Sequence, residues 1–352
     1  MQQTPVYFRE IFASLNEVLN QKDYHPVFIL VDENTHEDCL PILLPEIQKD
    51  FTFEIIEIPS GEENKVIEIA ANVWETMAQL EGSRKSLMIN LGGGMLTDIG
   101  GFIASTFKRG IDFINIPTTL LSMVDASVGG KTGIDLSGIK NAVGTFAMPV
   151  STFIYPEFLE TLPEREFRSG IAEMLKHGLI YNKNHWENLN SITNFNSSTI
   201  KDLIEESVKI KQEVVEKDPF ESGLRKILNF GHTIGHAIES ESLETENPFL
   251  HGEAIAMGML VESVLSFENE LISLEELDEI FISIVRIFGK TPIPEEIIPN
   301  LLNWMKQDKK NTKGQISFSL LNGIGNCQYD IFLTDEQILE GILLYNRKLS
   351  MI

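Results

Sequence analysis

Three of the chain's seven histidines fall within one short window. His232 and His236 lie in NFGHTIGHAIES, and His251 opens HGEAIAMG, while AEMLKHG upstream supplies Glu173 and Lys176. Side chains four residues apart share a helix face, so His232 and His236 can serve one site. Two histidines and a carboxylate with an open position form one type of catalytic zinc site.

The spacing offers one more candidate ligand than such a site needs. It leaves open which histidine is the spare that could carry protons, and whether one or two of them are core or capping side chains. The stretch HTIGH also departs from the HExxH pattern, which disfavours a metalloprotease.

A glycine-rich stretch, LGGGMLTDIGGF, follows an apolar run. Gly92 and Gly94 fit a dinucleotide loop, but Thr97 occupies the third glycine position. Glycines let backbone N–H groups approach a diphosphate, and a following helix N-terminus favours negative charge. Asp98 could bond a sugar hydroxyl or cap a turn. The motif alone leaves nucleotide binding and a plain tight turn both open.

A second glycine-rich stretch, SVGGKTGIDLSGIKNAVGTF, ends a P-loop pattern without beginning one, because Asp125 stands where its first glycine is needed. Lys131, Lys140 and Asn141 then lie among what we interpret as flexible glycine-rich turns, with Arg109 upstream. In a chain of net charge −24, such a cluster favours a bound phosphate or carboxylate.

The same net charge disfavours partners that are nucleic acids or anionic membranes. No apolar run is long enough for a transmembrane helix, and the first residues do not resemble a secretory signal. The two cysteines, Cys39 and Cys327, are far apart and form no CxxC pair. We expect a reducing, cytoplasmic setting.

The elements that must position these residues change character along the chain. The first part alternates apolar strands with a helical pattern, which predicts a parallel α/β sheet that binds its ligand at the strand ends. The predicted strands lie in HPVFILVDEN, FTFEIIEIP, KSLMINLGGG and FINIP, and the helix in EENKVIEIAANVWETMAQL. Long helical patterns follow, within 164–181, 198–218, 252–269 and 273–289. We therefore expect an α/β domain over residues 1–157 and a mostly α-helical domain over 158–352, with IYPEFLETLP as the hinge.

Six motifs taken together identify a family resemblance. They are GGGMLTDIGGFIAS, FKRGIDFINIPTTLLSMVDASVGGKTGID, GIKNAVGTF, AEMLKHG, LRKILNFGHTIGHAIE and HGEAIAMGM. With these motifs the chain resembles the 3-dehydroquinate synthase family nearly end to end, most strongly from residue 91 to 253. The resemblance implies a Rossmann-like NAD-binding domain, a helical metal- and substrate-binding domain, and a homodimer. It also implies conversion of 3-deoxy-D-arabino-heptulosonate 7-phosphate, a phosphorylated sugar acid, to 3-dehydroquinate and phosphate in the shikimate route to aromatic compounds, with catalytic NAD+ and a divalent metal, usually zinc or cobalt.

The resemblance also implies a role for each site residue. It makes Glu173, His232 and His251 the metal ligands, and His236 a nearby proton carrier. The NAD-binding residues would be Asp32, Glu62, Lys65, Gly93, Gly94, Asp98, Thr118, Thr119, Lys140, Phe158 and Thr161. The substrate-binding residues would be Arg109, Asp125, Lys131, Asn141, Lys176, Lys211, Arg225, Asn229 and either Lys309 or Lys310. The catalytic set would be Lys131, Lys176, Glu221, Arg225 and His236. Arg109 would hold the phosphate of a neighbouring subunit's substrate.

Two positions depart from the family pattern. Asp135 stands where the family usually has Asn, and Met148 where it usually has Gln.

Three other functions are alternatives to dehydroquinate formation. Another sugar phosphate cyclase, such as 2-deoxy-scyllo-inosose synthase or an epi-valiolone synthase, would share fold, NAD and metal, but the set Lys211, Glu221 and Arg225 favours dehydroquinate formation. A polyol dehydrogenase of the glycerol dehydrogenase type would release NADH. A regulatory domain that had lost catalysis would not need the intact Glu and His set.

Overall fold

The computed structural model describes residues 4–48, 53–136, 139–243, 245–306 and 316–352. The chain divides into two compact units, Met1–Pro163 and Glu164–Ile352. The domain boundary that the sequence suggested after residue 157 stays a prediction. Among the described residues, no helix combines the length and apolar character needed to cross a membrane.

The first unit is built on a six-stranded sheet in the order β1-β8-β5-β4-β2-β3, in which all neighbours are parallel. The strands are β1 Val6–Tyr7, β2 Val27–Asp32, β3 Phe53–Ile58, β4 Leu87–Gly92, β5 Asp112–Pro117 and β8 Ser151–Phe153. Every residue of β2 and β4 is buried, as expected for central parallel strands with near-continuous apolar sequence. The four predicted strands are confirmed, whereas β1 and β8 are too short to give a pattern.

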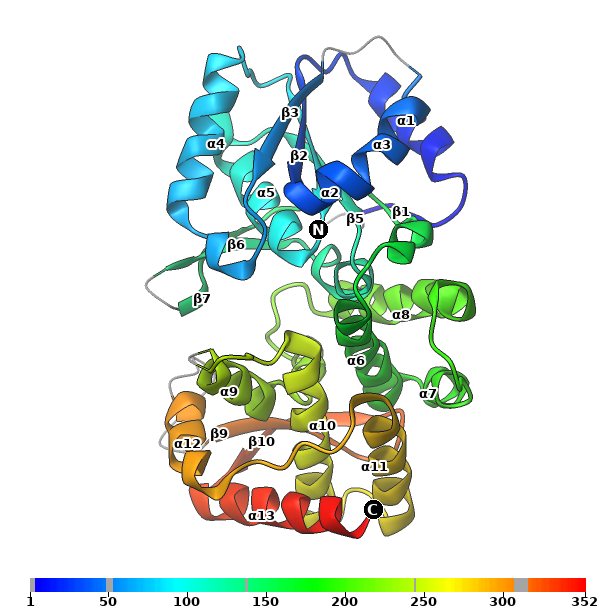
Figure 1. Cartoon of the computed structure of the whole chain (residues 1–352), viewed down its shortest axis with the longest axis vertical. Helices are drawn as coiled ribbons and strands as arrows, with labels where there is room; N and C mark the ends of the chain where they lie inside the picture. Colours follow the sequence, from blue (N-terminus) through cyan, green and yellow to red (C-terminus); the bar gives the residue numbers. More distant parts are fainter. Residues whose placement is uncertain (1–3, 49–52, 137–138, 244, 307–315) are drawn as a thin grey trace. The chain divides into compact units, whose positions relative to one another are not determined.

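Helices cover both faces of this sheet (Figure 1). They are α1 Ile11–Gln21, α2 Glu33–Asp38, α3 Leu40–Leu43, α4 Ile67–Gln79 and α5 Gly94–Thr106. One apolar core forms where α4 and α5 meet the sheet, with Met77 and Ile99 packed near Phe28 and Leu30. The predicted Rossmann-like α/β fold of the N-terminal part is confirmed.

The strand order reverses within the sheet between β3 and β4. From β2 the chain continues to β3 on one side and then returns to β4 on the other side of β2. In open α/β sheets, ligands bind outside the carboxyl ends of the strands at such a reversal. Asp32 ends β2, Gly92 ends β4 and Gly93 follows, so the predicted cofactor residues Asp32 and Gly93 lie at this point.

The interpretation of residues 131–146 as flexible glycine-rich turns is wrong. The stretch forms an antiparallel hairpin of β6 Lys131–Leu136 and β7 Ile139–Phe146, with Gly133 opposite Gly144. Glycine is usually depleted in strands, which hid the hairpin. Here the backbones leave no room, since a Cβ on Gly144 would lie 2.2 Å from the Thr132 carbonyl oxygen.

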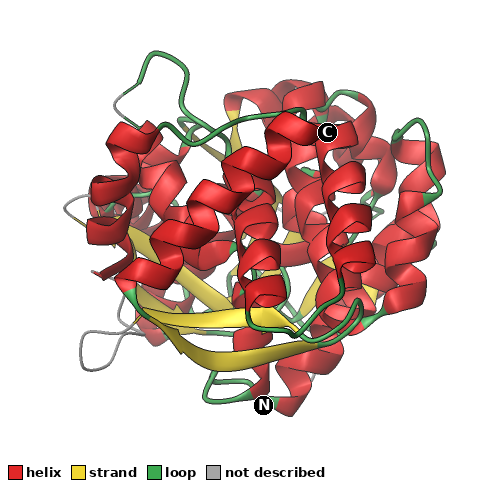
Figure 2. Cartoon of the chain, turned by 90° about the horizontal axis from the view of Figure 1, so that it is seen from below, coloured by secondary structure: helices red, strands yellow, loops and turns green. Residues whose placement is uncertain are grey.

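The second unit is mostly helical, as predicted, and Figure 2 shows the predominance of helix in red. Its helices are α6 Glu164–Tyr181, α7 Lys183–Asn190, α8 Ser197–Lys217, α9 His232–Ser242, α10 His251–Glu268, α11 Leu274–Phe288, α12 Ile298–Lys306 and α13 Asp335–Met351. All four predicted helical stretches are confirmed. An antiparallel pair, β9 Ile316–Leu321 and β10 Cys327–Leu333, was not predicted. Helix α10 is buried along most of its length and packs against α6, α9, α11 and α13.

Candidate metal and nucleotide sites

Three helices of the second unit bring the candidate metal ligands together. Glu173, in the middle of α6, is fully buried, and its Oε1 lies 3.6 Å from His232 Nε2 and 3.8 Å from His251 Nε2. His236 follows one turn after His232 on α9, with ring centroids 5.0 Å apart. The ligand atoms of the three histidines lie within 4.8 Å of one another. The structure therefore gathers all four residues that the sequence singled out.

The second ring nitrogen of two histidines faces an oxygen. His232 Nδ1 lies 3.2 Å from the Phe230 carbonyl oxygen, and His251 Nδ1 lies 3.5 Å from Glu239 Oε2. Metal-binding histidines almost always donate their other N–H to a carbonyl or carboxylate, which fixes the ring and its tautomer. Nε2 of both rings faces Glu173, so the donor set fits a divalent cation held by one carboxylate and two imidazoles. Glu239 was missed from sequence, although it follows His236 by one helical turn.

Charges around the cluster are tightly coupled. Lys176 is buried one turn after Glu173 and pairs with its Oε2. Burial, Lys176 and the neighbouring imidazoles hold the pKa of His232 well below its usual value. Burial would lower the pKa of His251 too, but Glu173 and Glu239 outweigh it and raise the pKa to about 9.

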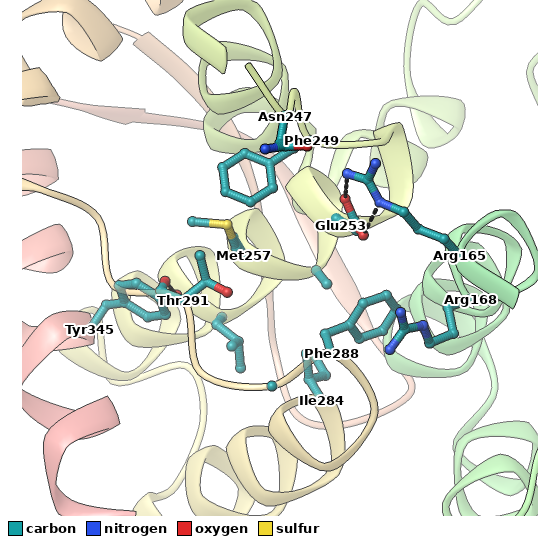
Figure 3. A pocket seen from close by; sticks show the side chains of 13 residues that line it. Arg165, Arg168, Asn247, Phe249, Glu253, Met257, Ile284, Phe288, Thr291 and Tyr345 are labelled. Carbon is teal, nitrogen blue, oxygen red and sulfur yellow. Dashed lines mark hydrogen bonds and ion pairs between the residues drawn. The ribbon is translucent and has the colours of Figure 1, made fainter. Parts of the chain in front are cut away.

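Helices α6 and α10 are locked together next to the cluster. Arg165 donates from Nε and Nη2 to the two carboxylate oxygens of Glu253, at 2.8 and 2.6 Å (Figure 3). Ser169 Oγ accepts the Gly252 N–H at 2.9 Å, and a Cβ at position 252 would lie 2.1 Å from the Ser169 carbonyl oxygen. Burial would raise the pKa of Glu253, but Arg165 and the Leu250 N–H hold it below its usual value. These bonds fix the first turn of α10, where His251 lies, against α6.

The loop that precedes α9 is organised by a residue that the sequence did not single out. Asp218 is 8% exposed, and its carboxylate accepts backbone N–H groups of Ser222, Gly223 and Arg225 at 3.0, 2.6 and 3.1 Å. Arg225 is buried and donates from Nη1 to the Pro219 carbonyl oxygen at 2.8 Å. Asp218 therefore fixes the conformation that presents the predicted catalytic Arg225.

Two further predicted residues pair directly in this loop. Asn229 Nδ2 donates to Glu221 Oε1 at 2.7 Å, and Glu221 has a left-handed backbone with φ of 58°. Lys211 is buried on α8. Lys309 and Lys310 lie outside the described residues, so the predicted choice between them stays open.

In the first unit, the glycine stretch joins β4 directly to α5. Gly93 precedes the helix and Gly94 begins it. Thr97 Oγ1 donates to the Gly94 carbonyl oxygen, inside the first turn. A Cβ on Gly100 would lie 2.1 Å from Asn90 Oδ1. The close helix-to-strand contact that the third glycine of GxGxxG normally allows is therefore made by Gly100, which explains why Thr97 is tolerated.

The predicted cofactor residues Glu62 and Asp98 form ion pairs with the buried ammonium group of Lys65. Lys65 Nζ lies 2.9 Å from Asp98 Oδ2 and 3.1 Å from Glu62 Oε1, and Lys65 is 3% exposed. Burial would lower the pKa of Lys65, but Asp98 and Glu62 raise it above its usual value. Asp32 caps α2 by accepting the Thr35 N–H at 2.8 Å. The other predicted cofactor residues also lie in this unit, namely Gly93, Gly94, Thr118, Thr119, Lys140, Phe158 and Thr161.

Predicted anion-binding residues of the first unit lie in unusual backbone. Lys108, Arg109 and Gly110 have consecutive φ values of 51°, 70° and 106°. Asn141 has φ of 51°, and Asp135 Oδ1 accepts its N–H at 2.7 Å. Non-glycine residues in this region are strained, and such strain concentrates at functional sites. The aspartate that departs from the family pattern therefore stabilises the strained backbone at Asn141, within β7.

Solved structures share this fold. The structure of 2-deoxy-scyllo-inosose synthase with carbaglucose-6-phosphate, NAD+ and Co2+ matches with a TM-score of 0.85 at 22% identity, covering 97% of this chain and 98% of that one. The structure of 2-epi-5-epi-valiolone synthase from Streptomyces hygroscopicus with NAD+ and Zn2+ has a TM-score of 0.82 at 25% identity, covering 99% and 97%. A probable glycerol dehydrogenase from Sinorhizobium meliloti has a TM-score of 0.63 at 13% identity, covering 99% and 97%. The fold is thus that of a structural class containing sugar phosphate cyclases and polyol dehydrogenases.

Within that class, sequence comparison is more specific. The family model of the 3-dehydroquinate synthase N-terminal domain matches residues 55–169, and that of the C-terminal domain matches residues 170–311. A 3-dehydroquinate synthase of Parabacteroides distasonis is 41% identical over 354 residues, covering 99% of each chain. One from Streptococcus pyogenes serotype M3 is 36% identical over 340 residues, covering 94% of this chain and 92% of the relative. The chain belongs to the 3-dehydroquinate synthase family and is an enzyme of that family.

Replacing Asp218 by Asn is expected to disorganise the Arg225 loop, because an amide turns an N–H2 group toward backbone donors. We expect a loss of about 1–3 kcal/mol in the free energy of unfolding and at least a tenfold loss of turnover, measured by urea denaturation and steady-state kinetics. Burial would raise the pKa of Asp218, but the three N–H groups lower it. The difference in free energy of unfolding between wild type and Asp218→Asn should therefore be largest above the unfolded-state pKa of about 4. It should disappear as the pH falls through the lower pKa that Asp218 has in the folded protein.

The matched control is Asp202→Asn, an exposed aspartate on α8. Equal unfolding free energies and equal turnover for both variants would contradict the role given to Asp218.

Proposed function

We propose that this chain eliminates phosphate from 3-deoxy-D-arabino-heptulosonate 7-phosphate and forms 3-dehydroquinate, using catalytic NAD+ and a divalent cation. The observation that carries the proposal is the buried Glu173 carboxylate faced by Nε2 of His232 and His251. Related cyclase structures contain NAD+ with Co2+ or Zn2+, which supports the choice of cofactors.

Glu173, His232 and His251 would hold the cation, as the sequence resemblance implied. A bound divalent cation acts as a Lewis acid and lowers the pKa of hydroxyls that it contacts. Phe230 and Glu239 keep the two imidazole rings turned so that Nε2 faces Glu173. His236, which is exposed, would act as the proton carrier beside them.

The first unit would bind NAD+ at the β2 and β4 ends. Bound NAD+ supplies a hydride acceptor that is restored within one turnover. Backbone N–H groups at Gly93 and Gly94 and the N-terminus of α5 would receive the diphosphate. The Lys65 network would set the position of Asp98 toward the nucleotide.

Positively charged and amide side chains would bind the anionic groups of the substrate. The sequence resemblance gives this role to Lys176, Lys211, Arg225 and Asn229 of the second unit and to Lys131 and Asn141 of the first, whereas the Asp125 carboxylate would accept a hydrogen bond from a substrate hydroxyl. A buried positively charged side chain interacts more strongly with a carboxylate or phosphate than an exposed one, because water screens the interaction less. The Glu221 carboxylate, oriented by Asn229, would assist proton transfer. Lys211, Glu221 and Arg225 together support dehydroquinate formation over the other cyclase outcomes.

We expect the purified chain with NAD+ and heptulosonate phosphate to release phosphate without net change in nicotinamide absorbance. A chelator should abolish release, and added Zn2+ or Co2+ should restore it. His251→Ala should reduce it by more than the roughly 10- to 100-fold that loss of an outer partner of a metal site costs. His36→Ala, at an exposed histidine, serves as the control. Net accumulation of NADH would instead indicate a polyol dehydrogenase, and phosphate release unaffected by chelation would contradict the proposed metal.

We further propose a homodimer in which Arg109 reaches the neighbouring subunit's phosphate site. The strained turn at Arg109 supports a functional role for its side chain. Co-expressing Arg109→Ala with His251→Ala chains should restore activity, because a hybrid dimer has one site with both residues. Hybrid dimers selected through two affinity tags should therefore recover about half of wild-type activity per chain, since one of their two sites is intact.

The control pairs Arg109→Ala with the Arg109→Ala, His251→Ala double variant, which leaves no intact site. Activity is measured as phosphate release by mixtures purified through two affinity tags. A hybrid dimer as inactive as its parents would show that Arg109 does not act across subunits.

A further inference from the structure

A buried glutamate links the two helices that carry the candidate histidines. Glu262 on α10 has no exposed surface. Its Oε2 accepts the Gly231 N–H at 2.6 Å and its Oε1 accepts the Ile234 N–H at 3.1 Å. These two N–H groups bracket His232, the first residue of α9.

The start of α9 lacks a cap of its own. The first N–H groups of a helix have no partner within it and are usually satisfied by a side chain at the preceding residue. Here that residue is Gly231, with φ of 80° and no side chain to offer. The Glu262 carboxylate takes this place from another helix, where its charge also suits the positive end of the α9 dipole.

Helices α9 and α10 pack so closely that their backbones are in contact, and a small displacement of one helix would cause a steric clash with the other. A Cβ on Gly258, one turn before Glu262, would lie 2.0 Å from the Gly231 carbonyl oxygen. A Cβ on Gly235 would lie 3.0 Å from the Ala254 carbonyl oxygen. Glycines thus set the separation of the two helices, and the two bonds from Glu262 set how far α9 slides or turns along α10.

We infer that Glu262 is a positioning residue for the metal site, acting through the N-terminus of α9 on His232 and His236. This inference rests on the proposed metal site. Its two bonds reach the backbone N–H groups of Gly231 and Ile234, and through this backbone its effect passes to His232. Without the Glu262 carboxylate, two buried N–H groups lose their acceptor. The position of His232 relative to His251, the first residue of α10, is then no longer fixed.

The test compares Glu262→Gln with Ser263→Ala in the full chain. The side-chain amide in Glu262→Gln would offer one acceptor oxygen and turn an N–H2 group toward the second backbone N–H. Ser263 is equally buried on the same helix, but within the described part of the chain its hydroxyl bonds only to the Met259 carbonyl oxygen of α10. Zn2+ affinity is measured by competition with a chromophoric chelator, and the Co2+ absorption spectrum reports ligand geometry.

We expect Glu262→Gln to weaken Zn2+ binding by about 10- to 100-fold and to shift the Co2+ bands, with Ser263→Ala close to wild type. A purely structural role would lower the melting temperature of the metal-free protein and leave both metal readouts unchanged, which would overturn the inference. If Glu262→Gln does not fold, Glu262→Asp, which keeps the charge on a shorter side chain, is measured in the same way. Wild-type affinity and spectrum in that variant would also overturn it.

The two proposals fail separately in this experiment. A wild-type chain that binds no Zn2+ would remove the proposed function and this inference with it. A wild-type chain that binds Zn2+ as tightly as its Glu262→Gln variant would remove only the inference.

Discussion

The central constraint in this protein is a carboxylate taken out of water. Glu173 is fully buried, and an uncompensated charge there would be very unfavourable. Lys176 and the Nε2 atoms of His232 and His251 surround it. One carboxylate and two imidazoles whose outer nitrogens already face oxygens form a set suited to a divalent cation. A divalent cation held there would act as a Lewis acid in a place with little water to screen it.

Three helices must hold their relative positions for such a site to exist. The α6–α10 pair is fixed by Arg165 with Glu253 and by Ser169 with the Gly252 N–H. The α9–α10 pair is fixed by Glu262 and by close glycine contacts. Helix α10 takes part in both and carries His251 itself, so it acts as the reference for the other two. Its burial along most of its length makes it a rigid reference, because few side-chain rearrangements are open to it.

The sequence could predict what depends on local pattern. Apolar periodicity located α6, α8, α10 and α11, and helical spacing placed His232 and His236 on one face. The spacing left the identity of the spare histidine open, because spacing does not tell which ring nitrogens face an acceptor. Asp218 and Glu262 were missed for the same physical reason, since their partners are backbone N–H groups, which have no residue type to recognise. The hairpin at residues 131–146 was missed because its glycines serve close backbone contact, and glycine by itself indicates a turn.

The most direct test of the central claim is the coordination shell of a bound ion. X-ray absorption of the Co2+-loaded full chain should show first-shell nitrogen and oxygen with the multiple-scattering pattern of two imidazoles. A chain with Glu173, His232 and His251 all replaced should lose that pattern. If the loaded wild type shows only solvent oxygen around Co2+, or if the triple replacement leaves the spectrum unchanged, the metal site described here does not exist.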